Sequence, residues 1–232
     1  MKIIALFRAL RQLNLNTIIF NFHYFKFRDA IRFPVLVSRQ FHFVEKGGRV
    51  TISAPIGFGM ITIGYGHVGI FDKQRSRTLW ECSGHVIFRG NATLWHGSKI
   101  SVGRDGTLDI GPRHIMSAEA CYVVHHHVKI GGDGGTSWEV LVMDTDFHPI
   151  TDADGKVINL PEEIVIGDHV WIGCRSLILK GSHIPDSSVI AAGTIVTGKL
   201  PSGNTIYAGV PARAVRSGVQ WKLEPIKVLS DC

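Results

Sequence analysis

A histidine directly followed by a proline, His148-Pro149, lies in a stretch rich in aspartate, proline and glycine at residues 144–163. This composition is typical of a loop that projects from a scaffold. Pro149 restricts the backbone of His148 to extended or turn conformations, which limits the directions open to the imidazole. An imidazole accepts and releases a proton near neutral pH, so His148 is a candidate general base. Asp146 is a candidate to orient that ring or to hold an acceptor, and it also fits a simple turn former.

Three consecutive histidines at residues 125–127 form a second candidate cluster. Successive side chains of a strand point to opposite faces, so at most two of the three share a face. No cysteine or acidic residue accompanies them at ligand spacing, and the sequence therefore predicts no metal site. His125 and His127 are instead candidates to line a substrate pocket, with ordinary packing as the alternative.

A six-residue period defines the elements that must position these side chains. Three units of six residues, each one short strand and one corner, close a coil of about 18 residues, and such coils stack as parallel strands. An α-helix would need apolar residues at three- and four-residue spacing instead. Stacked coils predict interior ladders such as Ile166–Ile184 and Ile172–Ile190. The units open with Ile166, Ile172, Ile178, Ile184, Ile190 and Val196, and their fifth positions are small or β-branched.

The same pattern is present but broken upstream, as aliphatic-x-aliphatic-Gly segments between residues 61 and 131. The sequence therefore predicts an all-β chain in three parts. Residues 1–50 form a basic, partly helical cap segment, residues 51–210 form a parallel β-helix with an extruded loop at 144–163, and residues 211–232 form a tail.

Charge is concentrated at the N-terminus. Of the 25 Lys and Arg and 19 Asp and Glu, nine basic and two acidic residues fall in residues 1–50, so the remainder of the chain is nearly neutral. A neutral body argues against nucleic acid as a partner. The basic, aromatic N-terminal segment, with apolar residues at helical spacing from residue 3 to 10, fits a cap over the first coil, contact with a membrane surface, or both.

Four widely spaced cysteines without a CxxC pair do not suit a disulfide scaffold. The first apolar run is interrupted by Arg8 and Arg11 before it reaches the length of a signal peptide, and no run approaches a membrane span. We therefore expect a cytoplasmic protein, with peripheral contact at the inner face of the cell membrane as an option.

Residues 164–173, 190–196 and 207–216 resemble the hexapeptide-repeat acyltransferases. Within that superfamily they look most like the galactoside, maltose and capsular or O-antigen polysaccharide O-acetyltransferases. The resemblance implies a left-handed coil, a homotrimer, and acetyl-CoA bound as acyl donor in the groove between neighbouring β-helices. It also implies that His148, the matching position of a loop histidine in a His-Pro setting, acts as the base.

The same resemblance assigns donor-binding residues. Trp171 matches a tryptophan near the thioester, although packing at a coil corner is an equal alternative. Arg213 and Arg216 match phosphate-binding arginines, with a solvated edge as the alternative. Relatives usually carry Thr-Lys where this chain has Thr197-Gly198-Lys199, so Lys199 is displaced by one residue. The residues implied to line the groove are Gly173, Cys174 and Ala192, and no acyl-enzyme is expected at Cys174.

The leading expectation is an O-acetyltransferase that acts on a saccharide hydroxyl of a polysaccharide precursor or lipid-linked sugar. Two alternatives stay open: N-acylation of a nucleotide-linked amino sugar, and a non-catalytic β-helix scaffold.

Overall fold

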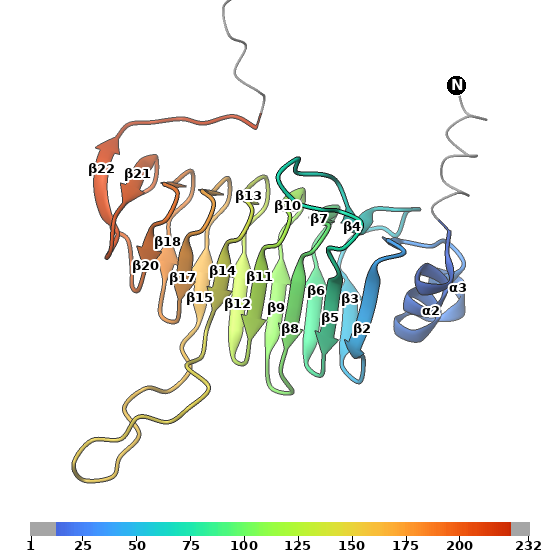
Figure 1. The fold of residues 1–232 in the computed structure, drawn as a ribbon, viewed down its shortest axis with the longest axis horizontal. Helices are drawn as coiled ribbons and strands as arrows, with labels where there is room; N and C mark the ends of the chain where they lie inside the picture. The colour runs from blue at the N-terminus through green and yellow to red at the C-terminus, as the bar shows by residue number, and fades with distance from the viewer. Residues whose placement is uncertain (1–12, 224–232) are drawn as a thin grey trace, which may run out of the picture.

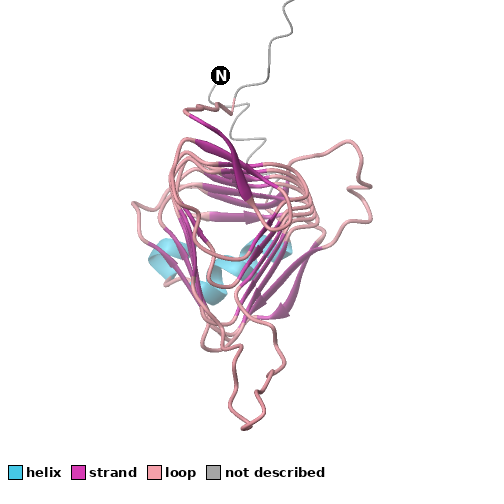
Figure 2. Ribbon diagram, turned by 90° about the vertical axis from the view of Figure 1, so that its left-hand side faces the viewer, coloured by secondary structure: helices cyan, strands magenta, loops and turns pink. Residues whose placement is uncertain are grey.

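The computed structural model describes residues 13–223, and their strands wind into a left-handed parallel β-helix of triangular cross-section (Figures 1 and 2). Each of the three sides is a sheet in which a strand is hydrogen-bonded to the third strand after it, except at the C-terminal end of sheet A, where β19 pairs with β21 and β21 with β22. All strand pairs are parallel except the last, β21 with β22. The predicted fold class is confirmed.

Sheet A contains β1 (Val35–Val37), β4 (Ile61–Tyr65), β7 (Ala92–Trp95), β10 (His114–Met116), β13 (Gly135–Thr136), β16 (Trp171–Ile172), β19 (Val189–Ile190), β21 (Thr205–Ala208) and β22 (Arg213–Ser217). Sheet B contains β2 (Phe41–Glu45), β5 (Thr78–Cys82), β8 (Lys99–Val102), β11 (Cys121–Val124), β14 (Leu141–Met143), β17 (Leu177–Leu179) and β20 (Ile195–Val196). Sheet C contains β3 (Arg49–Ile52), β6 (His85–Phe88), β9 (Thr107–Ile110), β12 (His127–Ile130), β15 (Ile164–Ile166) and β18 (His183–Ile184).

The regular coils have the interior ladders that the six-residue period predicts. Ile166 pairs with Ile184 and Ile172 with Ile190, and all four side chains are buried. Burial of one isoleucine contributes roughly 1.5–3 kcal/mol, so these columns supply much of the core. The fifth positions have little room, and those with hydroxyls are fully buried: Ser176, Ser182, Ser188 and Thr194.

The interior of the earlier coils contains large buried side chains, among them Trp80, Phe88 and Tyr122. A chain of polar groups crosses this interior. The Tyr122 hydroxyl lies 2.9 Å from Nε2 of His114 and 2.8 Å from the hydroxyl of Thr136. Burial lowers the pKa of His114 to about 4, so this ring is neutral in the folded protein at neutral pH.

The β-helix begins earlier than the predicted boundary at residue 51. Strands β1, β2 and the first half of β3 lie within residues 35–50 and form the first coil. This coil has no hexapeptide unit in the sequence, and its buried side chains combine the aromatic Phe41 with Val35 and Val37, which stack on the next coil. The boundary expected from the repeat was therefore placed too late.

Two short helices, α2 (Leu15–Tyr24) and α3 (Phe27–Ala30), close the N-terminal end of the prism (Figure 1). Phe20 of α2 is fully buried and packs against Phe41, Phe43 and Trp80. Asn21 donates a hydrogen bond of 2.7 Å to the Val35 carbonyl, which satisfies a group at the open edge of β1. The predicted helical stretch at residues 3–10 lies outside the described residues.

At the other end, β22 lies within the predicted tail and pairs antiparallel with β21. The chain then returns along the outside of sheet A (Figure 1). There the Trp221 ring stacks on His169 with centroids 4.3 Å apart and an interplanar angle of 8°.

Candidate functional site

The extruded loop, residues 144–163, leaves the corner between sheets B and C, after β14 and before β15 (Figures 1 and 2). Asp144 at its root is fully buried. Its carboxylate accepts the backbone N–H groups of His125 at 2.7 Å and His126 at 2.8 Å. The loop root is therefore tied to the histidine corner of the preceding coil.

Asp146 is held from two sides. Its carboxylate accepts hydrogen bonds from Lys180 Nζ at 2.6 Å and from Asn159 Nδ2 at 2.9 Å. The Lys180 bond, with a smaller effect of Asn159, holds the pKa of Asp146 below its usual value. Asn159 Nδ2 also donates to the His148 carbonyl at 2.9 Å, and the His148 N–H donates to the Asp146 carbonyl at 2.7 Å. Asp146 thus fixes the backbone of His148, and the imidazole remains exposed on the loop.

The two candidate pocket histidines both face the loop. The His125 ring meets the Phe147 ring edge-on, with centroids 4.9 Å apart. Nδ1 of His127 lies 2.7 Å from a carboxylate oxygen of Glu163, where the loop rejoins β15. The structure therefore brings His125, His127, Asp146 and His148 to one corner.

The residues implied to line the donor groove lie at another corner, between sheets A and B. Trp171 opens β16 with 43% of its surface exposed, and its Nε1 donates to Ser137 Oγ at 3.1 Å. Gly173 follows, and a Cβ there would come within 2.6 Å of the Ala192 nitrogen, so the coils approach more closely than a side chain allows. Cys174 is half-buried beside them and Ala192 is exposed.

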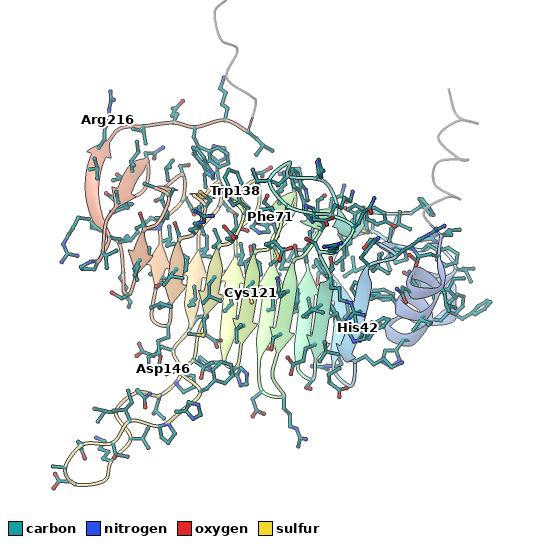
Figure 3. All side chains as sticks on the ribbon, viewed as in Figure 1. His42, Phe71, Cys121, Trp138, Asp146 and Arg216 are labelled. Atoms are coloured by element: carbon teal, nitrogen blue, oxygen red, sulfur yellow. The ribbon has the colours of Figure 1, made fainter. Side chains whose placement is uncertain are left out.

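The remaining candidates lie toward the C-terminal end. Thr197 and Lys199 are exposed beyond β20, on the sheet B–sheet C corner. Arg213 and Arg216 are exposed on β22, at the end of sheet A (Figure 3).

One chain does not bring the His148 loop to the donor corner. The two corners are opposite edges of sheet B, and the three-residue strands between them span about 10 Å. End-on, the loop extends from the vertex opposite sheet A (Figure 2), and Asp146 and Trp138 lie on opposite sides of the prism (Figure 3). Within one chain, the loop and the donor corner therefore lie on opposite edges of sheet B.

A groove of about 600 Å³ on the outside of sheet A was not expected from the sequence. Its floor is Ile115 and Gly135, which are in register on neighbouring strands. Four of the five tryptophans of the chain line it: Trp95, Trp138, Trp171 and Trp221. Their unequal spacing in the sequence gave no signal that they meet.

Comparisons with known proteins agree with this architecture. The chain is 46% identical to the galactoside O-acetyltransferase of Escherichia coli (strain K12) over 124 residues, which cover 52% of this chain and 55% of the relative. It is 30% identical over 112 residues to the putative lipopolysaccharide biosynthesis O-acetyl transferase WbbJ of the same strain, covering 44% of this chain and 53% of the relative. The resemblance to hexapeptide-repeat acyltransferases is confirmed.

The chain thus spans about half the length of these curated relatives. No family model matches it. Among solved structures, the fold is similar to that of the polySia specific acetyltransferase NeuO, with a TM-score of 0.59 and 23% identity over 84% of this chain and 77% of that chain. At that level of identity the structural likeness establishes the shared fold.

Residues 13–223 contain no group of three or more His, Cys, Asp and Glu side chains arranged to hold a metal ion.

Proposed function

We propose that this protein is an O-acetyltransferase that moves acetyl from acetyl-CoA to a hydroxyl of a saccharide. The observation that carries the proposal is an exposed histidine on an anchored loop, in a chain similar to a galactoside O-acetyltransferase over about half its length. Asp144 ties the root of the loop to His125, and Asp146, just before His148, is held by Lys180 and by Asn159 from the returning side of the loop. A positioned imidazole at the edge of a rigid coil is suited to general base catalysis.

In the proposed reaction His148 accepts the proton of the acceptor hydroxyl as its oxygen attacks the thioester carbon. The C–O bond forms, the C–S bond then breaks, and the protonated imidazole returns the proton to the departing CoA thiolate. No acyl-enzyme is formed. Trp171, Gly173, Cys174 and Ala192 are proposed to line the path of the donor, with Thr197, Lys199, Arg213 and Arg216 near its phosphates.

We infer a homotrimer in which each site is shared between copies. The separation of the His148 loop from the donor corner within one chain supports this arrangement. The loop also carries exposed apolar side chains that an isolated chain leaves in water: Phe147, Ile150, Val157, Ile158 and Leu160. Burial of such residues against a neighbouring copy would stabilise a closed, symmetric assembly.

The acceptor is tested with purified protein, acetyl-CoA and a panel of sugars, read by release of the CoA thiol. Hydroxyl-bearing glycans such as galactosides and polysaccharide fragments should support thiol release. Turnover only with nucleotide-linked amino sugars would favour N-acylation instead. If the protein binds no acyl-CoA, the remaining interpretation is a non-catalytic β-helix scaffold.

A second partner, a membrane surface, is favoured by the outer face of the N-terminal cap. Leu15, Ile18 and Phe22 follow one face of α2 and are at least 43% exposed. Phe27 of α3 is 73% exposed and its ring lies 6.1 Å from Phe22. Three exposed basic residues lie close to Phe22 and Phe27 in the sequence: Lys26, Arg28 and Arg32.

An apolar face with basic neighbours suits the interface of an anionic bilayer. Neither described helix has the length and apolar composition needed to cross a bilayer. We therefore propose a cytoplasmic enzyme that contacts the inner face of the cell membrane through residues 1–50, where a lipid-linked sugar would be within reach.

A further inference from the structure

The tryptophan groove on sheet A is built mainly from hydrocarbon. Gly135 leaves a hollow between the in-register side chains of Ile115 and Trp171. Trp95 and Trp138 line the hollow with Val68, which comes from the loop at residues 66–77 between β4 and β5. A volume of about 600 Å³ is within the range of pockets that enclose a small ligand.

The indole N–H groups at one end of the groove are already used within the protein. Trp171 Nε1 donates to Ser137 Oγ at 3.1 Å, and Trp221 Nε1 donates to the His169 carbonyl at 2.8 Å. The His169 ring returns a hydrogen bond of 3.0 Å to the Trp221 carbonyl and stacks on its indole. Trp221 is thus held in place, and it contributes an apolar face to the groove rather than a hydrogen bond.

The groove continues the proposed path of the donor. From the arginines on β22 the path runs past Ala192 and Cys174 to Trp171, and the groove begins at Trp171 and extends toward β10 and β7. A group attached beyond the thioester would therefore enter the groove. An acetyl group has a single methyl there, which occupies a small part of such a volume.

We propose that this groove binds the acyl chain of the donor, and that it accepts linear aliphatic chains longer than acetyl. The inference rests on the proposed acyl-CoA-dependent function and names a wider donor class for the same site. A saccharide is a poorer fit at the Trp171 and Trp221 end, because the N–H groups of these two indoles are engaged and every hydroxyl left unpaired against them carries a cost. An alkyl chain needs only the apolar faces that the groove offers.

The test measures direct binding of acetyl-, butyryl-, hexanoyl- and octanoyl-CoA to the full-length protein by calorimetry, without an acceptor. Each methylene that enters the groove should tighten binding by about two- to four-fold, so hexanoyl-CoA should bind roughly 10–10² times more tightly than acetyl-CoA. Acetyl-CoA binding without such a gain would overturn the acyl groove and leave the proposed function standing. Failure of every acyl-CoA to bind would overturn both.

Two variants test whether the gain in affinity with chain length comes from the groove. Gly135→Leu fills the floor, and a Cβ there lies 3.1 Å from the Ile115 carbonyl oxygen, so a small shift of the strand is enough to accept it. It should lower the hexanoyl-to-acetyl ratio of affinities at least ten-fold. Val189→Leu enlarges a side chain by one methylene on the same outer face, beside Trp171 on the next strand, and should leave the ratio unchanged.

Trp221→Ala removes a half-buried wall of the groove and no core residue, so it should also lower the ratio. This variant provides the test if Gly135→Leu does not fold. Equal ratios in all variants would overturn the assignment. So would a glycan that competes equally with every acyl-CoA, because it would assign the groove to the acceptor.

Discussion

Lys180 Nζ lies 2.6 Å from a carboxylate oxygen of Asp146, and this ion pair joins the extruded loop to the coil that follows it. Lys180 also donates to the Asn159 carbonyl at 2.9 Å, so one ammonium group holds both strands of the loop base. The pair lies at the sheet B–sheet C corner, directly beside the backbone of His148. The position of the proposed base therefore depends on a lysine 32 residues away in the sequence.

The first prediction concerns pH and this ion pair. The pKa of Asp146 is lowered in the folded protein, so the pair is fully formed above the ordinary aspartate range and is lost as the pH falls through the lowered value. Limited proteolysis of the loop should be slow at pH 7 and should become faster only in strongly acidic buffer. Asp146→Asn should show fast cleavage already at pH 7, whereas equally fast cleavage of both proteins at pH 7 would contradict the anchoring role.

The second prediction concerns the proposed base. His148→Ala should lower kcat by about 10²–10⁴-fold while the affinity for CoA changes little, because the imidazole acts on the acceptor proton. Steady-state kinetics and CoA binding measure the two effects separately. His42→Ala, an exposed histidine on β2 far from the loop (Figure 3), is the matched control and should retain full turnover. A His148→Ala enzyme with normal kcat would refute the assignment.

The third prediction concerns His114 inside the early coils. Its pKa, lowered to about 4 by burial, lies below the ordinary value near 6.5, so its contribution to stability is complete above pH 6.5 and is lost as the pH falls toward 4. The loss amounts to roughly 3 kcal/mol across that window. Urea unfolding from pH 7 to 4 should therefore be less pH-dependent in His114→Phe than in the wild type. His183→Asn, on the exposed face of sheet C, should retain the wild-type slope.

The fourth prediction tests whether each active site is shared. His148→Ala removes the base, and Ala192→Trp blocks the exposed donor corner, so each variant alone should be nearly inactive. The two variants are unfolded together in equal amounts and refolded as mixed trimers. About one quarter of the sites should then combine an intact loop with an intact corner, so the activity should recover to about one quarter of that of the wild type. No recovery in a mixture shown by mass spectrometry to contain mixed trimers would contradict a shared site.

The fifth prediction concerns the cap surface. Phe22→Ser with Phe27→Ser should weaken binding to vesicles that contain anionic lipid by ten-fold or more in a flotation assay. Both side chains are exposed, so the urea midpoint should change little. Val215→Ser, with a side chain 67% exposed at the opposite end of the prism, controls for general loss of apolar surface. Unchanged flotation of the double variant would rule out this face as the contact.

The regular coils were predictable because one physical constraint, an interior wide enough for one aliphatic per strand, repeats at a fixed interval. The Ile166–Ile184 and Ile172–Ile190 ladders follow from it directly. The first coil was not predictable, because its strands have no six-residue period and Phe41 packs there against Phe20 of α2 and Trp80 of the next coil.

The site was predictable only in part. His148 stood out because proline and aspartate mark a loop, but its anchor Lys180 belongs to an ordinary repeat unit and gave no signal. The tryptophan groove depends on coil lengths that vary between Trp95, Trp138 and Trp171, and on a tail that brings Trp221 back over sheet A. Contacts of this kind depend on the three-dimensional path of the chain and not on local sequence.

The two long corner loops leave the parallel stacking of the strands in place. Val128 stays in register with Ile164 across the loop at residues 144–163, and Ile63 stays paired with Leu94, with a register shift between Ile63 and Tyr65 just before the loop at residues 66–77. Material added at a corner is therefore accommodated mainly outside the prism. We consequently expect a corner loop to be exchangeable for one of different length or chemistry while hydrophobic columns such as Ile166–Ile184 keep their alignment.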